Sequence, residues 1–528
     1  MDVFGYLDGM KYISGKDRSQ TTLFPTSLED IIEDNNTVRS IDLFVEQLDM
    51  SKLGFKTNFM ENGRPGYHPK ALLKLFIYGY MNRIRYSRQL EKECRRNLEV
   101  MWLLESLTPD HNTISNFRKD NSKAIKRTFH ATVTLARNFG LIGAQLIAGD
   151  GTKMRAQNSK KNNYNLKKVA RHIEYIDNKL DEYNRELEQT QDPEQQQQIK
   201  QHRDKQQQRR SGYDKIKSQL EDSQDTQLST SDPDSRHLIV RNNITEVAYN
   251  VQSTVDAQHC IPIDYHVTNS NDRKAMGNML RRAKTILRTK EFTALFDKGY
   301  HTGSELCTAH QLDIDTLVAI PGIGRGSQAP DPNYNSENFQ YNDTEDTYTC
   351  PEGNTLKSNG SWYTTRNYRF KQYKTKKCRD CKVRALCTAS KVNGKVLQRS
   401  QYQEYIENNA QRVEDQRDTY KRRQAIVEHP FGTIKRQWGF DHILTKKTKQ
   451  RASADVGFIF IAYNLKRILK LLKGKGGLKD LHREIVCQCR VHIYHITTPY
   501  QRINRFTIQS LKLHVLTLNS IFLNYMKI

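Results

Sequence analysis

Two short apolar runs in this sequence end in the same way, and together they restrict the fold. In LIAGDGT, Asp150 follows an apolar run and stands between two glycines. In TALFDKG, Asp297 follows a second such run and precedes a glycine-containing turn. A carboxylate at the end of a buried strand costs desolvation energy unless a cation meets it. The two runs therefore predict a mixed α/β sheet whose strand-end aspartates converge on a divalent cation, although a strand-end aspartate that merely caps a turn is the common alternative.

The residues between these runs support a sheet with helices around it. Residues 246–268 alternate between apolar and polar positions in the manner of strands. Residues 271–287 have the apolar spacing of an amphipathic helix. The order of strand, strands, helix and strand predicts a fold of the α/β class.

The segment RRQAIVEHPFGTIKRQWGF supplies a third acid and several cations. Glu428 and Lys435 are seven residues apart, so on a continuous helix they share one face. Pro430 lies between them and is expected to kink or restart that helix. With Asp150 and Asp297, Glu428 would complete a site for two metal ions, whereas an ordinary solvated helix face is the alternative. The predicted DNA-phosphate contacts are Lys435, Arg422, Arg423 and Arg436.

The charge of the chain favours a polyanionic partner. Its 528 residues include 84 Lys and Arg against 59 Asp and Glu, a formal net charge of +25. The alternative is a protein that is basic without binding DNA. The first residues contain no apolar signal-peptide core and no apolar run is long enough to span a bilayer, so we expect a cytoplasmic, nucleoid-associated protein with no membrane partner. No GxxxxGK[ST] loop is present, so nucleotide hydrolysis is not expected.

Changes in composition divide the chain into five expected regions. They are a helical DNA-binding or dimerisation domain over 1–140, the first part of the α/β domain over 141–310, a β-rich insertion over 311–401, a helical completion of the α/β domain over 402–475 and an unassigned tail over 476–528. The first region fits a helix-turn-helix-like DNA binder and, equally, a helical bundle that packs on the next domain. Within the second, residues 158–222 carry a heptad pattern that predicts an inserted helical hairpin or, equally, a dimerising coiled coil.

Four cysteines of the β-rich region have spacings seen in metal sites. Cys378, Cys381 and Cys387 lie in KKCRDCKVRALC, and Cys350 precedes them in YTCPEG. Four thiolates can enclose a tetrahedral structural zinc ion, and free buried thiols are the alternative. A total of nine cysteines without an export signal fits a reducing compartment.

Taken in order, several blocks of this chain resemble the DDE transposases of bacterial insertion sequences, in particular the group called IS eleven-eighty-two. They are GDGTKMRA, YNVQSTVDAQHCIP, FDKGYHT, VEHPFGTIKRQWGF and IAYNLKRIL, preceded by a stretch over residues 66–121 that resembles an InsH-type N-terminal domain. Asp256 and Asp272 also fall in family-like blocks. Related transposases carry a Tyr, Arg, Glu and Lys signature, in which Glu428 and Lys435 match the last two positions and Arg423 lies one residue farther from Glu428 than the signature has it.

The resemblance implies an RNase H-like catalytic core with a helical N-terminal domain, an inserted helical hairpin and a β-rich four-cysteine insertion. It implies that Asp150, Asp297 and Glu428 bind two Mg²⁺ or Mn²⁺ ions. The implied function is a cut-and-paste DNA transposase that binds terminal inverted repeats and target DNA, cleaves DNA and transfers strands, and acts as a homodimer on paired ends. A metal-dependent DNA nuclease of the same fold and a catalytically decayed DNA-binding protein are the alternatives.

Overall fold

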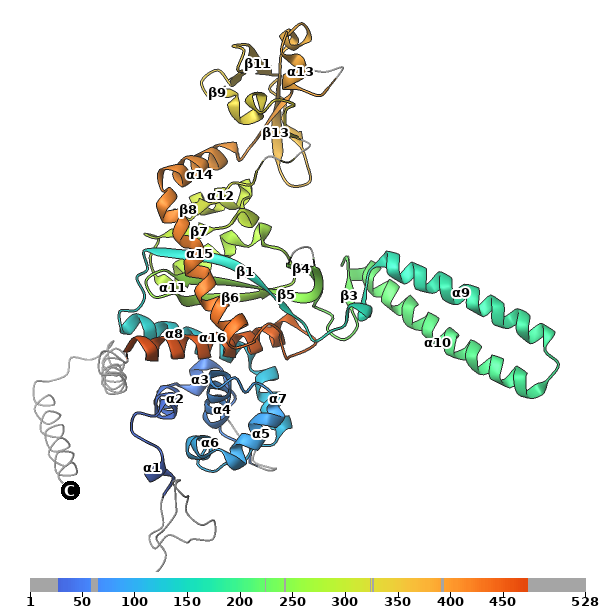
Figure 1. The fold of residues 1–528 in the computed structure, drawn as a ribbon, viewed down its shortest axis with the longest axis vertical. Helices are drawn as coiled ribbons and strands as arrows, with labels where there is room; N and C mark the ends of the chain where they lie inside the picture. The colour runs from blue at the N-terminus through green and yellow to red at the C-terminus, as the bar shows by residue number, and fades with distance from the viewer. Residues whose placement is uncertain are drawn as a thin grey trace, which may run out of the picture.

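The computed structural model describes residues 27–57, 65–223, 225–241, 244–322, 324, 327–390 and 394–472. The tail over 476–528 and the N-terminal stretch expected to lack a signal peptide lie outside the described residues. Figure 1 shows a body built on one central sheet, with a group of helices below it, a smaller sheet above it and a long helical hairpin that projects sideways.

The central sheet has six strands in mixed orientation. Its strands are β1 (Leu146–Arg155), β4 (Arg236–Arg241), β5 (Ile244–Asp256), β6 (Ile261–Thr268), β7 (Thr293–Phe296) and β8 (Asp315–Val318). The order is β4-β5-β1-β7-β8, and β6 also pairs with β5. β1 is antiparallel to β5 and parallel to β7, and β7 is parallel to β8. The sheet therefore joins an antiparallel unit to a parallel one at β1.

Helices cover this sheet on both faces. They are α8 (Ser122–Asn138), α11 (Met276–Leu287), α12 (Gly303–Gln311), α14 (Gln403–Asp415), α15 (Arg417–Gly432) and α16 (Lys449–Leu472), with short turns η2 (Asp272–Lys274) and η3 (Lys298–Tyr300) after β6 and β7. Successive residues of a strand point to opposite faces. Accordingly, Ile147 lies in the large core that includes α8 and α16, whereas Ala148 lies in a second core with Val427 of α15.

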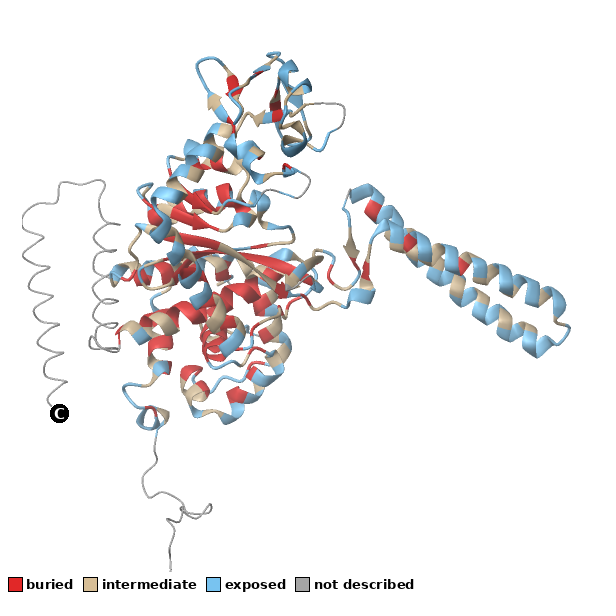
Figure 2. Cartoon of the chain, turned by 45° about the horizontal axis from the view of Figure 1, so that its top comes forward, coloured by how far each residue is buried: buried red, intermediate tan, exposed pale blue. Residues whose placement is uncertain are grey.

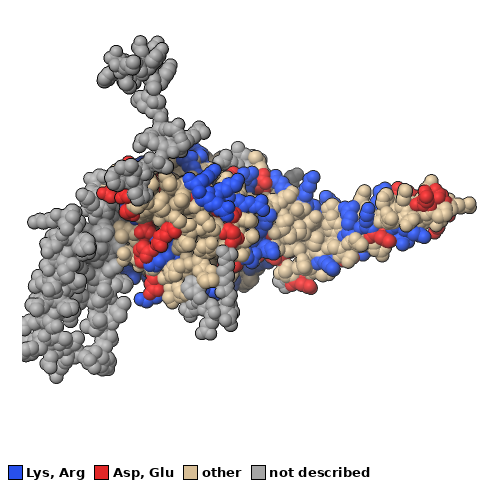
Figure 3. Space-filling model, turned by 90° about the horizontal axis from the view of Figure 1, so that it is seen from below, with Lys and Arg blue, Asp and Glu red and all other residues tan. Residues whose placement is uncertain are grey.

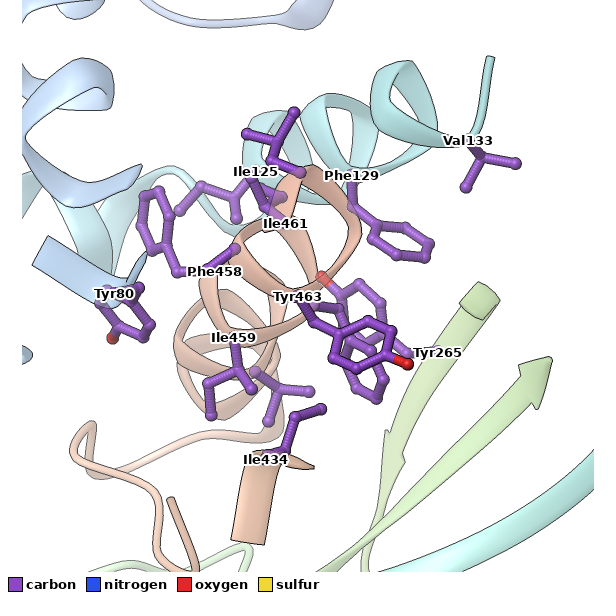
Figure 4. Close-up of a cluster of buried hydrophobic side chains, with 14 of the residues drawn as sticks. Tyr80, Ile125, Phe129, Val133, Tyr265, Ile434, Phe458, Ile459, Ile461 and Tyr463 are labelled. Carbon is purple, nitrogen blue, oxygen red and sulfur yellow. The ribbon is translucent and has the colours of Figure 1, made fainter. Parts of the chain in front are cut away.

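The N-terminal helices share the core of the sheet instead of forming one of their own. They are α1 (Leu28–Ile31), α2 (Thr37–Glu46), α3 (Met50–Leu53), α4 (Pro69–Met81), α5 (Ser87–Arg96), α6 (Leu98–Leu103) and α7 (His111–Asp120). One continuous cluster of buried side chains runs from α2 and α4 through α16 to β6. Figure 4 shows α16 in this cluster, with Phe458 beside Tyr80 of α4, and Phe460 of α16 stacks on Tyr265 of β6 with ring centroids 5.4 Å apart. The N-terminal helices therefore pack on the α/β domain through a shared core.

A buried ion cluster reinforces the same junction. Asp455 of α16 is fully buried and faces Arg85 at 2.8 Å and Arg118 at 3.5 Å, while Tyr80 donates a hydrogen bond to it. Burial raises the pKa of Asp455, but the two guanidinium groups hold it below its ordinary value. Arg85 also donates to the His442 carbonyl at 2.8 Å. Because a buried charge is costly without a partner, these groups fix the N-terminal helices to α16.

The projecting hairpin consists of α9 (Leu166–Gln189) and α10 (Pro193–Ser223), which lie antiparallel. At its base, β2 (Asn163–Tyr164) pairs with β3 (Leu228–Ser229), next to η1 (Lys160–Asn162). Figure 2 shows that buried residues are concentrated in the body, whereas the hairpin is mostly exposed. The heptad positions Val169 and Ile176 are among the few buried side chains of the hairpin.

In the sequence, the second sheet is inserted between the last strand of the central sheet, β8, and the covering helices α14, α15 and α16. Its strands are β9 (Gln340–Asn342), β10 (Thr347–Thr349), β11 (Thr355–Ser358), β12 (Tyr363–Thr364), β13 (Arg369–Lys374) and β14 (Leu397–Ser400), with α13 (Arg384–Cys387) and turns η5 (Pro332–Tyr334), η6 (Ser336–Asn338) and η7 (Lys376–Arg379). The order is β12-β13-β11-β10-β9, with β14 paired to β13. A small apolar core around Leu356 and Tyr373 holds it together.

Candidate active site

Strand geometry places Asp150 and Asp297 on the same face of the sheet. In the parallel pair of β1 and β7, Ala148 stands opposite Leu295, and each aspartate comes two residues later. Asp297 directly follows β7 as expected, whereas β1 does not end at Asp150 but continues to Arg155, because it stays paired with β5. Side chains two residues apart share a face. Ala148 and Leu295 both face α15, so both carboxylates face α15 as well.

A third carboxylate, Asp272 of η2, lies beside this pair. A Cβ atom added to Gly151 would collide with Asp272, and one added to Gly299 would lie 3.0 Å from Asp297 Oδ1 and 3.7 Å from Asp272 Cβ. The two glycines therefore allow the backbone segments to approach each other closely. Asp272 is held by Lys153 at 2.9 Å and by the side-chain amides of Asn250 and Gln252 at 2.8 and 2.6 Å. The sequence assigned it no role, because nothing local shows that the turn after β6 reaches β1.

The environment of Asp150 makes its ionised form costly. Its pKa is raised to about 6, chiefly by burial and also by the nearby Asp297 and Asp272, against the lowering effects of Arg423 and the Gly151 amide. Buried Tyr300 lies beside the same three carboxylates; its pKa is raised well above the ordinary value, chiefly by burial, so the phenol remains neutral. It donates a hydrogen bond to Gln252. A cation between the aspartates would relieve their mutual repulsion.

Helix α15 brings the basic residues to these acids. Arg423 Nη1 lies 3.5 Å from Asp150 Oδ2, and the Tyr420 hydroxyl donates to the Phe296 carbonyl at 3.2 Å. Pro430 lies inside α15, which continues past it to Gly432, so the helix does not restart at the proline. Directly after α15, Thr433–Gln437 form a π-helix. Lys435 in this wider turn donates to Thr152 Oγ1 at 3.1 Å and to the Lys153 carbonyl at 3.0 Å.

The structure thus groups only some of the predicted site residues. Asp150, Asp297 and Arg423 come together, whereas Glu428 is exposed on α15 and accepts a hydrogen bond from Gln424 at 2.9 Å. Arg422 and Arg436 are exposed on the same helical segment. In the described part of the chain, no group of three or more His, Cys, Asp or Glu side chains is arranged so that it could hold a metal ion.

The four cysteines predicted to bind zinc share one place in the second sheet. Together they line a small cavity of about 30 Å³ beside Leu356 and Phe339. Burial raises the pKa of Cys387, and the other three cysteines raise it further, while Lys395 lowers it. All four are free thiols, and they too fall outside any described group that could hold a metal ion.

Taken together, the fold and this site define a class of α/β protein. A pair of carboxylates, Asp150 and Asp297, lies where the parallel pairing of β1 and β7 ends, and the basic helix α15 packs over this pair. Comparison with known families is consistent with that class. Residues 26–120 match the family model of a transposase domain (DUF772), and residues 349–469 match that of a transposase DDE domain. The second match includes Arg423, Glu428 and Lys435. Both matched models are those of transposase domains, and together they support an insertion-sequence DDE transposase.

Other known proteins are more distant from this chain. No curated protein matches it. Among solved structures, the cryo-EM structure of a piggyBac transposase synaptic complex with hairpin DNA is similar over 90% of this chain and 85% of that one, at 10% identity and a TM-score of 0.33. Among the described helices, none is both long and apolar enough to cross a membrane.

Proposed function

We propose that this transposase cleaves DNA at terminal inverted repeats and joins the resulting 3′-hydroxyl ends to target DNA, as in cut-and-paste transposition. The observation that carries the proposal is the convergence of Asp150 and Asp297 at one point, where burial and neighbouring carboxylates raise the pKa of Asp150 to about 6. Mutually repelling carboxylates in a partly buried site are stabilised by a divalent cation, and such sites are suited to phosphoryl transfer.

The sheet supports an RNase H-like core as part of this proposal. Its antiparallel unit β6-β5-β1 continues into the parallel strands β7 and β8, with helices on both faces. The first acid lies on the central strand β1, and the second directly follows its parallel neighbour β7. The proposed division of the chain keeps the expected boundaries, in which residues 141–310 and 402–475 form the catalytic domain and 311–401 are inserted between them.

Asp150, Asp297 and Glu428 would hold two Mg²⁺ or Mn²⁺ ions. The pair of aspartates fits one such ion, since Mg²⁺ is usually bound by one or two carboxylates and keeps several waters. Glu428 on α15 offers a further oxygen ligand on the helix that carries Arg423. Bound ions of this kind activate water or a hydroxyl for attack and stabilise the leaving oxygen. Cys350, Cys378, Cys381 and Cys387 would hold a structural zinc ion, which their common cavity supports.

The basic residues of α15 and its extension would position DNA. Arg422 and Arg436 are exposed and available to phosphates, while Arg423 and Lys435 lie deeper, beside β1. Figure 3 shows Lys and Arg gathered on the body near the base of the hairpin, whereas the hairpin itself carries both signs. Phosphate contacts of this kind give salt-dependent affinity without reading sequence. We place the protein in the cytoplasm at the nucleoid, as a homodimer on paired ends of double-stranded DNA.

The test is an excision and strand-transfer assay with the full chain and the DNA that flanks its own gene. We expect Asp150→Asn, Asp297→Asn and Glu428→Gln to abolish cleavage while DNA binding persists, and Asp343→Asn, in an exposed turn of the second sheet, to leave cleavage unchanged. Cleavage by the unaltered chain that never joins a pre-cut 3′-hydroxyl end to target would indicate the nuclease alternative. DNA binding without any metal-dependent cleavage by the unaltered chain would indicate the decayed alternative.

A further inference from the structure

A cavity of about 420 Å³ lies between the candidate active site and the second sheet. One wall is the turn that carries Arg273 and Lys274, which directly follow Asp272. The opposite wall is the β12–β13 hairpin with Tyr368 and Phe370, and Tyr402 also lines the cavity. The volume falls within the range of about 300–1,000 Å³ typical of pockets that bind small organic groups. The cavity therefore joins the second sheet to the surroundings of the carboxylates.

The two walls are held in fixed relation by contacts on both sides. Thr302 donates to the Arg273 carbonyl at 3.1 Å, which ties the basic turn to the start of α12. A Cβ atom on Gly303 would lie 2.5 Å from Tyr402 Cβ, so α12 packs directly against the junction of the second sheet. On the other side, Phe370 pairs with Ser400 in the ladder of β13 and β14. The cavity is consequently a feature of packed elements.

Aromatic rings are exposed on the hairpin wall. Tyr368 is 39% exposed and Tyr363 is 38% exposed, and Tyr363 stacks on Phe370 with ring centroids 5.7 Å apart. The turn between the strands is ordered by Thr365, whose hydroxyl donates to the Tyr368 carbonyl at 2.8 Å. Rigid exposed aromatic rings next to a cavity offer flat apolar surfaces for stacking. The described residues that line this cavity include Arg273 and Lys274 and no Asp or Glu.

From these features we infer that the cavity binds an unpaired nucleotide of single-stranded DNA. The base would stack on Tyr368, and Arg273 and Lys274 would contact the phosphates. Stacking platforms combined with a basic groove are the means by which proteins hold single strands, whereas a duplex buries its base faces and cannot use them. The inference deepens the proposed function and rests on it, because it assigns a single-stranded segment of the substrate to the region beside the carboxylates.

The test measures binding of a fluorescent oligothymidine and of a duplex of equal length by anisotropy, in EDTA, with the full chain. Tyr368→Ala should weaken oligothymidine binding about 5- to 150-fold and leave duplex binding within about 2-fold, since the platform for one stacked base is removed. Tyr368→Trp should restore binding. The matched control is Tyr175→Ala, because Tyr175 is a 55% exposed tyrosine on the projecting hairpin. Thermal melting checks that Tyr368→Ala is folded.

Charge is tested separately by Arg273→Gln combined with Lys274→Gln. The slope of log affinity against log salt for oligothymidine should fall by about 0.7 for each phosphate that the variant no longer neutralises, while Lys205→Gln on α10 leaves it unchanged. Equal weakening of single-strand and duplex binding in Tyr368→Ala, or unchanged oligothymidine binding, would overturn the inference. The proposed catalysis is judged apart from it, because Asp150→Asn should retain oligothymidine binding even where cleavage is abolished.

Discussion

Asp150 provides a quantitative check on the site through the pH dependence of folding. Its pKa is about 6 in the folded protein against an ordinary value of 3.8, so the folded protein holds the proton more tightly than the unfolded chain does. For a single group this corresponds to about 3 kcal/mol of stability that is present at low pH and lost as pH rises from 3.8 through 6. Between pH 5 and pH 8 the loss amounts to about 1.4 kcal/mol. Asp150→Asn removes this ionisation and should flatten that part of the profile.

The assay is urea unfolding of the unaltered chain and of Asp150→Asn, in EDTA, across that pH range. The relevant quantity is the difference between the two free energies of unfolding at each pH, because all other titrating groups cancel in it. Asp343→Asn is the control and should follow the unaltered chain. Addition of Mn²⁺ at pH 8 should stabilise the unaltered chain more than Asp150→Asn, since ligand binding to the folded state adds stability. Parallel profiles for the unaltered chain and Asp150→Asn would refute the argument that Asp150 is held in a costly ionised form.

Two further predictions concern the packing around the site, and a third concerns the four cysteines of the second sheet. Asp455→Ala should destabilise the protein by about 3–5 kcal/mol in chemical unfolding, because it leaves two arginines buried without their carboxylate. The control Asp418→Ala, on the surface, should change the free energy of unfolding little. A small effect of Asp455→Ala would contradict the prediction. Gly149→Ala would press a methyl group into the ring of Phe296 and should lower the free energy of unfolding by about 1–3 kcal/mol. Gly212→Ala, on the open face of α10, should be neutral or stabilising. Equal melting temperatures for the two variants would argue against this packing. Elemental analysis of the unaltered protein purified without chelator should find zinc, and the Cys381→Ser variant should lack it. Unaltered protein without zinc would count against the four-cysteine site.

The strands that carry or precede the two aspartates could be predicted because strands have a short, strict repeat. The apolar runs before Asp150 and Asp297 indicate strands, and β1 and β7 do contain these runs, although β1 extends past Asp150. The fold class followed from the same local patterns together with the helical spacing between them. The sequence also indicates that Glu428 lies on a helix. It does not indicate that Glu428 and Lys435 make separate contacts, since these depend on the π-helix after Pro430.

Tertiary structure alone decided which of these residues meet. Asp272 reaches the carboxylate pair because Gly151 and Gly299 allow close approach, and Arg423 reaches Asp150 because α15 packs over β1. Likewise, Arg85 and Asp455 are 370 residues apart in sequence, so no periodic pattern could pair them. The sequence by itself determined the net charge of +25, the apolar runs and the acids that follow them, because these depend on composition and on neighbouring residues. The union of the N-terminal helices with the sheet and the cavity beside the second sheet arise from packing between distant segments, which local chemistry does not encode.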